Sequence, residues 1–305
     1  NGVFLFGSEL KALRAYKGFN NQIDRNVLSL YMQYMYVPTP YSIFKDVYKL
    51  EPGYILQVDE SGRTRPIEKI TSSVFSAQGV SIKQWYSLSS VAKRNQNNLI
   101  EDEDEAIELL EKTLLESVQS QLISDVPLGA FLSGGIDSSM IVGLMNKISS
   151  HPVKTFTIGF EESAFNEAIY AKEVAKHLGT DHHELYVTAS DAFEVIPSLH
   201  TIYDEPFADS SQIPTYLVSK LARQHVTVAL SGDAGDELFG GYNRYLWGER
   251  VWSKLKWIPP IMRQTLGTAI QKLPASTWDA AGYLLPNKYK VASMGDKAHR
   301  MAFRL

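Results

Sequence analysis

Residues 129–139, with the sequence GAFLSGGIDSS, constrain the fold more than any other stretch of the chain. A short apolar run leads directly into a turn rich in glycine and serine, where a helix is predicted to begin. Gly134 and Gly135 allow a tight turn and a close approach of the backbone to a ligand. The N–H groups of the following helix and three hydroxyls predict a cradle for an anion. The hydroxyls belong to Ser133, Ser138 and Ser139.

Asp137 lies within this predicted cradle. The turn lacks the lysine of the G-x-x-x-x-G-K-[ST] phosphate loop, so the ATPases and GTPases that use that loop are excluded. A carboxylate in a phosphate cradle repels phosphate unless a cation lies between them, so Asp137 favours bound Mg²⁺. The alternative is an ordinary Ser/Gly turn in which Asp137 only caps the helix.

A second stretch, residues 226–242, repeats this design with the sequence VTVALSGDAGDELFGGY. A β-branched strand again ends in Leu-Ser-Gly, and Asp233 and Asp236 follow it. In an open parallel sheet, ligands bind beyond the carboxyl ends of the strands at the point where the strand order reverses. If the two strands are neighbours, Asp137 and Asp236 face one crevice and can share one Mg²⁺ bound to a pyrophosphate.

The residues between the two stretches alternate between strand and helix patterns, which predicts an α/β fold with a doubly wound parallel sheet. Right-handed crossovers place the second and third strands successively on one side of the first strand and the fourth on its other side. The strand order then reverses between the two strands that end in Leu-Ser-Gly. We expect strands at 153–158, 182–187 and 226–230 beside the first, and helices at 104–121, 138–148, 165–178 and 214–224.

The composition narrows the classes of function. At 305 residues, of which 44% are hydrophobic, the chain can bury one large core or two smaller ones. A net charge of -4 gives no basic field for nucleic acid or an anionic membrane. The absence of cysteine excludes disulfides, zinc-thiolate sites and a thiol nucleophile within these residues. Neither an apolar run of about 20 residues nor a secretory signal pattern is present, so a cytoplasmic location is expected.

The first hundred residues and the last sixty give weaker signals. We expect a strand within residues 1–7, helices at 9–16 and 24–36, and two short strands within 44–56. Residues 57–100 are polar and predict a domain junction, anchored in a core by Trp85 and Tyr86. Beyond Tyr242, short helical patterns predict a helical lid or appendage.

The motifs at 133–139 and 231–242 are together similar to those of the asparagine synthase (glutamine-hydrolysing) family, a branch of the ATP pyrophosphatases. The resemblance implies an adenine nucleotide alpha hydrolase-like fold for residues 101–305, with a helical C-terminal appendage. It implies ATP and Mg²⁺, with Asp137 and Asp236 as metal ligands. The implied nucleotide contacts are Phe131, Leu132, Ser133, Gly134, Gly135, Asp137, Ser138, Ser139, Ile158, Ser231 and Gly232.

One departure from the family pattern and one loop bear on the identity of the acceptor. Asparagine synthetases usually have glutamate after the second Ser-Gly, where this chain has Asp233. The resemblance implies a general base there, although a shift of about 1 Å in a reacting group can matter about a hundredfold. The loop at 203–214 differs from the asparagine-forming enzymes, and Asp204 and Glu205 are candidates for contacting an amine or a metal. The alternative is an acidic loop that caps the next helix.

The segments Gly-Ser-Glu-x-Lys-Ala-Leu at 7–13 and Leu-x-Pro-Gly at 50–53 resemble the last part of a class II glutamine amidotransferase domain. Residues 1–90 are identified as the C-terminal part of such a domain. The resemblance implies an upstream segment with an N-terminal cysteine that hydrolyses glutamine, a role that no residue here can take. The family's Lys-Val-Asp-Arg-like segment does not occur before Leu305. Truncation at both ends is therefore expected.

The resemblance implies an ATP-dependent ligase that activates a carboxylate as an acyl adenylate and aminates it with ammonia from glutamine. L-Aspartate, giving asparagine, is the leading substrate. The first alternative is another carboxylate, such as a sugar uronic acid in polysaccharide assembly or an intramolecular lactam closure. The second is a non-catalytic nucleotide-binding regulator. The expected partners are small-molecule substrates, without nucleic acid or a membrane span, and a homodimer is compatible with the resemblance.

Overall fold

The computed structural model describes residues 3–60, 75–77, 79–161, 166–283 and 294–302. The chain divides into two compact units, Asn1–Gly232 and Asp233–Leu305. Among the described residues, no helix combines the length and the apolar character needed to cross a bilayer.

A four-stranded parallel sheet forms the centre of the first unit. Its strands are β4 (Leu128–Phe131), β5 (Lys154–Phe160), β6 (Asp181–Val187) and β7 (Val228–Leu230). They lie in the order β6-β5-β4-β7, which is the order expected from the sequence. The strand order reverses between β4 and β7, where Ala130 is paired with Leu230. The expected α/β architecture with a parallel sheet is confirmed.

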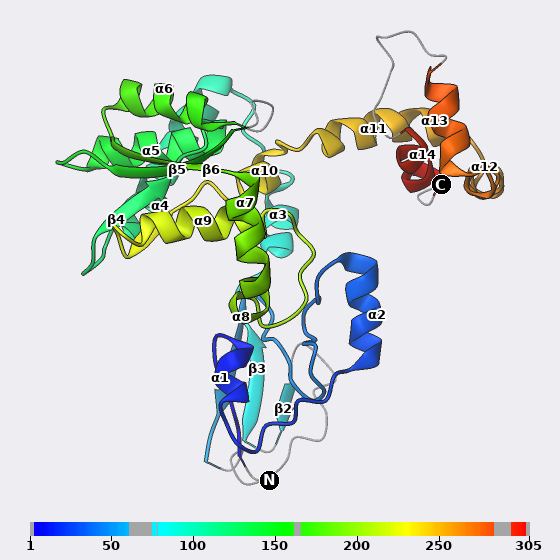
Figure 1. The fold of residues 1–305 in the computed structure, drawn as a ribbon, viewed down its shortest axis with the longest axis horizontal. Coiled ribbons are helices and arrows are strands. Elements are labelled where there is room, and N and C mark those ends of the chain that lie inside the picture. The colour runs from blue at the N-terminus through cyan, green and yellow to red at the C-terminus, as the bar shows by residue number, and fades with distance from the viewer. Residues whose placement is uncertain (1–2, 61–74, 78, 162–165, 284–293, 303–305) are drawn as a thin grey trace. The chain divides into compact units, whose positions relative to one another are not determined.

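Helices cover both faces of this sheet. Alternate residues of its strands point to opposite faces, so each face presents its own set of side chains to the helices. Ala130 and Leu132 pack with α4, α5 and α6, whereas Phe131 and Phe156 pack with α9. Figure 1 shows the strands between α6 and α9. The helices are α4 (Glu103–Gln121), α5 (Ile136–Ile148), α6 (Ala168–Leu178), α7 (Ala189–Val195), η3 (Ile196–Ser198), α8 (Leu199–Ile202) and α9 (Gln212–Ala222).

Phe156 is the largest side chain that is fully buried in the described part of the chain. Replacing it with alanine is expected to lower the free energy of unfolding by about 3–5 kcal/mol, because the substitution leaves a cavity between β5 and α9. The measurement is the denaturant midpoint, with an unchanged slope. Ile123→Ala is the control, since that side chain is 86% exposed. An equal shift in both variants would contradict the expectation.

A smaller antiparallel sheet lies in the N-terminal part of the first unit, with the order β1-β3-β2. The elements there are α1 (Leu10–Arg14), α2 (Arg25–Tyr34), β1 (Tyr54–Val58), β2 (Phe75–Ala77), β3 (Val80–Gln84) and α3 (Leu88–Asn95). Both expected helices are present. The strand expected within residues 1–7 is not found over 3–7, and residues 1–2 lie outside the described part. Of the two strands expected within 44–56, only β1 forms.

The anchor predicted at Trp85 and Tyr86 is wrong. Trp85 is 68% exposed, and its ring lies beside that of Tyr86, with 5.7 Å between the centroids. Val80 and Ile82 are the residues of β3 that are buried, on alternate positions of the strand. Strand β3 ends at Gln84, so Trp85 and Tyr86 lie beyond the strand that carries the buried side chains. Residues 75–77 and 79–95 carry β2, β3 and α3, where the sequence predicted a polar junction.

All the elements described in the second unit are helical. They are α10 (Gly235–Phe239), α11 (Asn243–Leu255), α12 (Pro260–Lys272), α13 (Ala275–Tyr283) and α14 (Met294–Ala302). Helix α14 packs on α12 and α13. The Trp278 Nε1 donates to the carbonyl of Ile270 at 3.3 Å, and the Arg263 guanidinium lies 4.9 Å from the ring centroid of Trp252. The tryptophans thus link helices within this unit.

Candidate active site

The turn between β4 and α5 is held in shape by its own serines. The Oγ atoms of Ser133 and Ser138 are 3.0 Å apart, and the Ser133 N–H donates to Ser138 Oγ at 3.2 Å. The Gly135 N–H donates to Ser133 Oγ, also at 3.2 Å. These bonds close residues 133–138 into a compact loop at the carboxyl end of β4. The sequence predicted this turn and the helix that follows it.

Gly134 cannot be replaced without moving α6. Its φ is +80°, a region that side chains other than glycine rarely adopt. A Cβ atom added there would lie 2.7 Å from the backbone nitrogen of Ala171 and 2.7 Å from the Cβ of Tyr170. Both atoms belong to α6, so the glycine allows the turn to lie directly against that helix.

The start of α5 offers donors to an anion. Gly135 is the N-cap and supplies no side-chain acceptor, so no side chain caps the first turn of the helix. The Ser139 Oγ is buried and has no hydrogen-bond partner among the described residues. A buried hydroxyl without a partner is costly, which a ligand oxygen would relieve. The donors at this turn therefore fit an anionic group such as a phosphate.

Asp137 lies in the first turn of α5 and is not its cap, because the N-cap position belongs to Gly135. The reading of Asp137 as a capping residue is therefore wrong. In the part of the chain that the structure describes, no group of three or more His, Cys, Asp or Glu side chains is arranged to hold a metal ion. Mg²⁺ is often held by one or two carboxylates together with substrate phosphates. A single carboxylate beside an anion cradle is a donor set that fits such an ion.

The Ser-Gly end of β7 lies against the first turn of α5. A Cβ atom added to Gly232 would be 2.7 Å from the Ser138 nitrogen and 3.0 Å from the Cβ of Asp137. The two Leu-Ser-Gly strand ends, 98 residues apart in sequence, therefore meet at the reversal of the strand order. This adjacency was expected from the repeated motif.

The second motif continues into the second unit, where α10 begins after Ala234, a residue with a φ of +74°. Asp233 is exposed, and Asp236 is half-buried. The Gly241 N–H donates to the Asp236 carbonyl at 3.0 Å, and any Cβ atom on Gly241 would overlap the Asp236 carboxylate. The Tyr242 hydroxyl donates to Glu237 Oε1 at 2.7 Å. Glycine at 241 thus leaves the space that the Asp236 side chain occupies.

The three remaining predicted nucleotide contacts have core side chains. Leu132 is fully buried in the cluster formed with α5 and α6, while Phe131 and Ile158 pack in the clusters on the α9 face. The Leu132 N–H is already bonded to the Phe156 carbonyl at 2.9 Å. The Leu132 side chain is therefore out of reach of a ligand, whereas those of Phe131 and Ile158 are half-buried.

Asp204 and Glu205 make contacts that the sequence did not predict. Glu205 forms an ion pair with Lys49 and accepts from the Ile43 N–H at 3.2 Å. Asp204 accepts from the Lys11 N–H at 2.9 Å, and its Oδ1 lies 3.3 Å from Lys11 Nζ. Neither acid caps α9, whose N-cap is Ser211, so the capping interpretation is wrong.

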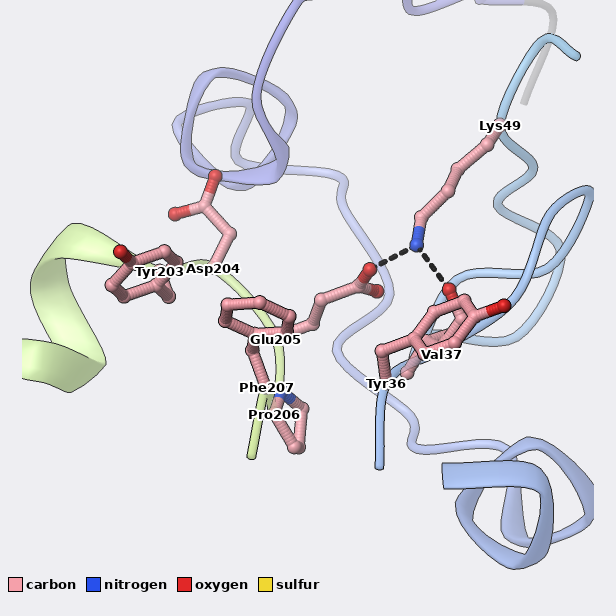
Figure 2. Close-up of a pocket in the computed structure, with 8 residues that line it drawn as sticks. All are labelled: Tyr36, Val37, Lys49, Tyr203, Asp204, Glu205, Pro206 and Phe207. Carbon is pink, nitrogen blue, oxygen red and sulfur yellow. Dashed lines mark hydrogen bonds and ion pairs between the residues drawn. The ribbon is translucent and has the colours of Figure 1, made fainter. Parts of the chain in front are cut away.

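A cavity of about 330 Å³ adjoins these acids. Figure 2 shows the Glu205 carboxylate reaching across it to Lys49, which also donates to the Val37 carbonyl at 2.8 Å. The lining residues are Tyr36, Val37, Lys49, Tyr203, Asp204, Glu205, Pro206 and Phe207. No sequence signal pairs these residues, because Lys49 and Glu205 are 156 positions apart.

His182 and His183 are neighbouring residues of β6. They point to opposite faces of β6. His182 Nδ1 is 2.8 Å from Thr155 Oγ1, and burial lowers the pKa of His182. The ring of His183 stacks on those of Phe156 and His225, with centroids 5.4 Å and 3.9 Å away. Both histidines are packing residues of the sheet.

Comparison with known proteins agrees with these motifs. Residues 109–301 match the family described as Asparagine synthase, and residues 1–69 match the family described as Glutamine amidotransferase domain. The chain is 39% identical over 251 residues to the putative asparagine synthetase [glutamine-hydrolyzing] 2 of Methanocaldococcus jannaschii, covering 81% of this chain and 44% of that protein.

Two bacterial relatives show the same pattern. The chain is 35% identical over 246 residues to asparagine synthetase [glutamine-hydrolyzing] 1 of Bacillus subtilis, covering 80% of this chain and 35% of that protein. It is 37% identical over 151 residues to asparagine synthetase B [glutamine-hydrolyzing] of Escherichia coli, covering 44% of this chain and 26% of that protein. The chain thus spans less than half the length of each of these three relatives. With 109–301 matched, the chain belongs to the asparagine synthase family.

Proposed function

We propose that this chain carries the ATP-binding centre of an amide-forming ligase, which activates a carboxylate as an acyl adenylate and aminates it with ammonia from glutamine. The observation that carries the proposal is the contact of the Ser-Gly end of β7 with the first turn of α5. Two loops rich in donors then converge where the strand order reverses, which is the usual ligand position in such a sheet.

In this proposal the cradle at 133–139 holds the pyrophosphate part of ATP. The hydroxyls of Ser133, Ser138 and Ser139, with the N–H groups of the first turn of α5, face the phosphate oxygens. Ser231 and Gly232 contact the nucleotide from β7. Leu132 contacts the adenosine part through its backbone, since its side chain is fully buried, and we propose backbone contacts for the half-buried Phe131 and Ile158 as well.

We propose Asp137 and Asp236 as the ligands that hold Mg²⁺. The metal supplies positive charge that offsets the charge of the departing pyrophosphate. Asp137 is suited to this role because it stands at a cradle for anions and does not cap the helix. Asp236 is suited because Gly241 leaves space for its carboxylate.

The reaction begins when an oxygen of the substrate carboxylate attacks the α-phosphorus and the bond to pyrophosphate breaks. The cradle holds the departing group and therefore stabilises the transition state. Ammonia then attacks the acyl carbon and AMP leaves. The nitrogen loses a proton, and we assign Asp233 as the general base that accepts it.

Asp233→Asn is expected to lower ammonia-dependent amide formation by about 10²–10⁴-fold, because the variant cannot accept the proton. ATP–pyrophosphate exchange is expected to stay near the wild-type rate, since exchange needs only the adenylate step. Both rates are measured on the same preparation of the complete gene product. Normal amide formation in the variant would remove Asp233 from this role.

L-Aspartate is the carboxylate we propose, in keeping with the asparagine synthetases that the chain resembles. The test is ATP–pyrophosphate exchange with the complete gene product and Mg²⁺, supplying L-aspartate or a panel of uronic acids. Exchange that depends on aspartate supports asparagine synthesis. Exchange with another acid alone keeps the mechanism and replaces the product. A protein that gives no exchange with any acid yet binds ATP is the non-catalytic regulator.

We also propose the following organisation. Residues 1–90 form the end of an amidotransferase domain, and residues 101–305 form an ATP pyrophosphatase domain, which the two matched ranges support. The strand order and the helices on both faces support a doubly wound fold, and the helices after Asp233 support a helical appendage. A cytoplasmic location and a homodimer complete the proposal.

A further inference from the structure

Residues 204–208 attach the strand-rich ATP-binding region to the N-terminal part of the first unit. We call the contacts of Asp204 and Glu205 with Lys11, Ile43 and Lys49 the acidic clamp. Next to the clamp, the Ala208 N–H donates to the Met35 carbonyl at 2.8 Å. The segments that meet are far apart in sequence, and one of them lies within the range that matches the amidotransferase family.

Each carboxylate of the clamp is satisfied in the same way. Asp204 and Glu205 each accept from one backbone N–H and one lysine ammonium. Their side chains are only 12% and 17% exposed. Removing one partner from such a pair leaves a largely buried charge unpaired, which costs far more than losing a surface pair. The clamp therefore favours one particular arrangement of the two segments.

The clamp is connected to the candidate active site through α9. Helix α9 begins at Gln212, four residues after Ala208, and packs on β5. Its cluster includes Phe131, the last residue of β4, and the cradle follows directly. The position of the clamp thus bears on how the amidotransferase-matching segment is held relative to the strand ends.

We infer that Asp204 and Glu205 are positioning residues that couple the supply of ammonia to amide formation, an inference that rests on the proposed function. Neither acid touches the substrate in this assignment. Ammonia released into water is diluted and protonated, so its use depends on how the two regions are held together. The clamp supplies that geometry through four contacts of two neighbouring side chains.

The test is Glu205→Gln in the complete gene product, assayed with glutamine and with ammonium as nitrogen source. Glutamine-dependent product formation is expected to fall about tenfold, because the coupling geometry is lost. Ammonia-dependent formation and ATP–pyrophosphate exchange should stay within about twofold of wild type. Glutamate released per pyrophosphate should rise. Lys49→Met should give the same changes as Glu205→Gln. Lys49→Arg should keep most of the coupling, since arginine keeps the positive charge.

Lys147→Met is the matched control. Lys147 pairs with Glu111 on the surface, where the side chains are 60% and 52% exposed, so the pair contributes little. The Lys147→Met variant should have the same ratio of glutamine-dependent to ammonia-dependent product formation as wild type. A purely structural role for the clamp would lower both nitrogen-source activities equally in Glu205→Gln, and that result would overturn the inference. A wild-type protein that uses ammonium but not glutamine would overturn it as well.

A second readout is independent of activity. The Ile43 amide donates to Glu205, so its hydrogen exchange should speed up in Glu205→Gln and stay unchanged in Lys147→Met. Unchanged exchange at Ile43 would contradict the clamp itself. If neither nitrogen source gives product and no exchange of pyrophosphate occurs, the proposed function fails. The hydrogen exchange of the Ile43 amide would then still report whether the clamp exists.

Discussion

Replacing Gly232 with alanine is expected to lower ATP–pyrophosphate exchange about a hundredfold, because it displaces the first turn of α5. The new Cβ would lie 2.7 Å from the nitrogen of Ser138 and 2.9 Å from the carbonyl carbon of Asp137. Both are backbone atoms, which cannot turn aside as a flexible side chain can. One of the two strand ends must therefore move, and the donors of the cradle move with it.

Gly143→Ala is the matched control for this substitution. Gly143 lies in the same helix, and a Cβ atom there would meet nothing within 4 Å. Alanine in a helix interior stabilises the helix by roughly 0.5–1 kcal/mol relative to glycine, so this variant should keep its activity and be at least as stable as wild type. Circular dichroism of both variants establishes that they are folded. ATP–pyrophosphate exchange at the wild-type rate by a folded Gly232→Ala protein would show that the contact of Gly232 with α5 does not shape the proposed nucleotide site.

Asp137→Asn is expected to lower Mg²⁺-dependent pyrophosphate exchange by about 10²–10³-fold, a loss like that of one stabilising group in a transition state. The amide keeps the size of the side chain but not the charge that would hold a cation. In the absence of Mg²⁺ the same variant should bind ATP at least as tightly as wild type, because the repulsion between the carboxylate and phosphate is gone. Titrations of exchange and of ATP binding against Mg²⁺ measure both effects.

Asp102→Asn is the control, because it makes the same chemical change at the N-cap of α4, where asparagine caps as well as aspartate. It should leave both titrations unchanged. Equal losses in the two variants would point to a general effect on folding. Weaker binding of ATP by Asp137→Asn without Mg²⁺ would contradict the proposed role of the carboxylate.

Much of the candidate site follows from local sequence. The turn at 133–135 and the start of α5 depend on glycine torsion angles and on serine hydroxyls, which act within a few residues. The strand order β6-β5-β4-β7 follows from the handedness of crossover connections, which is a general rule of parallel sheets. The sequence also predicted that α5 begins beside the end of β4.

Other features depend on contacts between distant segments, which local patterns do not encode. The acidic clamp joins residues that are 156 and 193 positions apart, and a lone lysine or glutamate carries no mark of its partner. Trp85 is exposed because β3 ends before it, although its size suggested a core position. His183 is half-buried, and the rings that it stacks on, Phe156 and His225, come from other elements.

The sequence by itself therefore determined the Ser-Gly turn between β4 and α5, the parallel α/β architecture and the family. Each depends on residues that are close in the chain or on a rule common to all such folds. Only the tertiary structure decided that Gly232 touches the first turn of α5 and that Asp204 and Glu205 pair with lysines. Those contacts arise when the folded chain brings distant segments together, and their partners are set by packing across the whole unit.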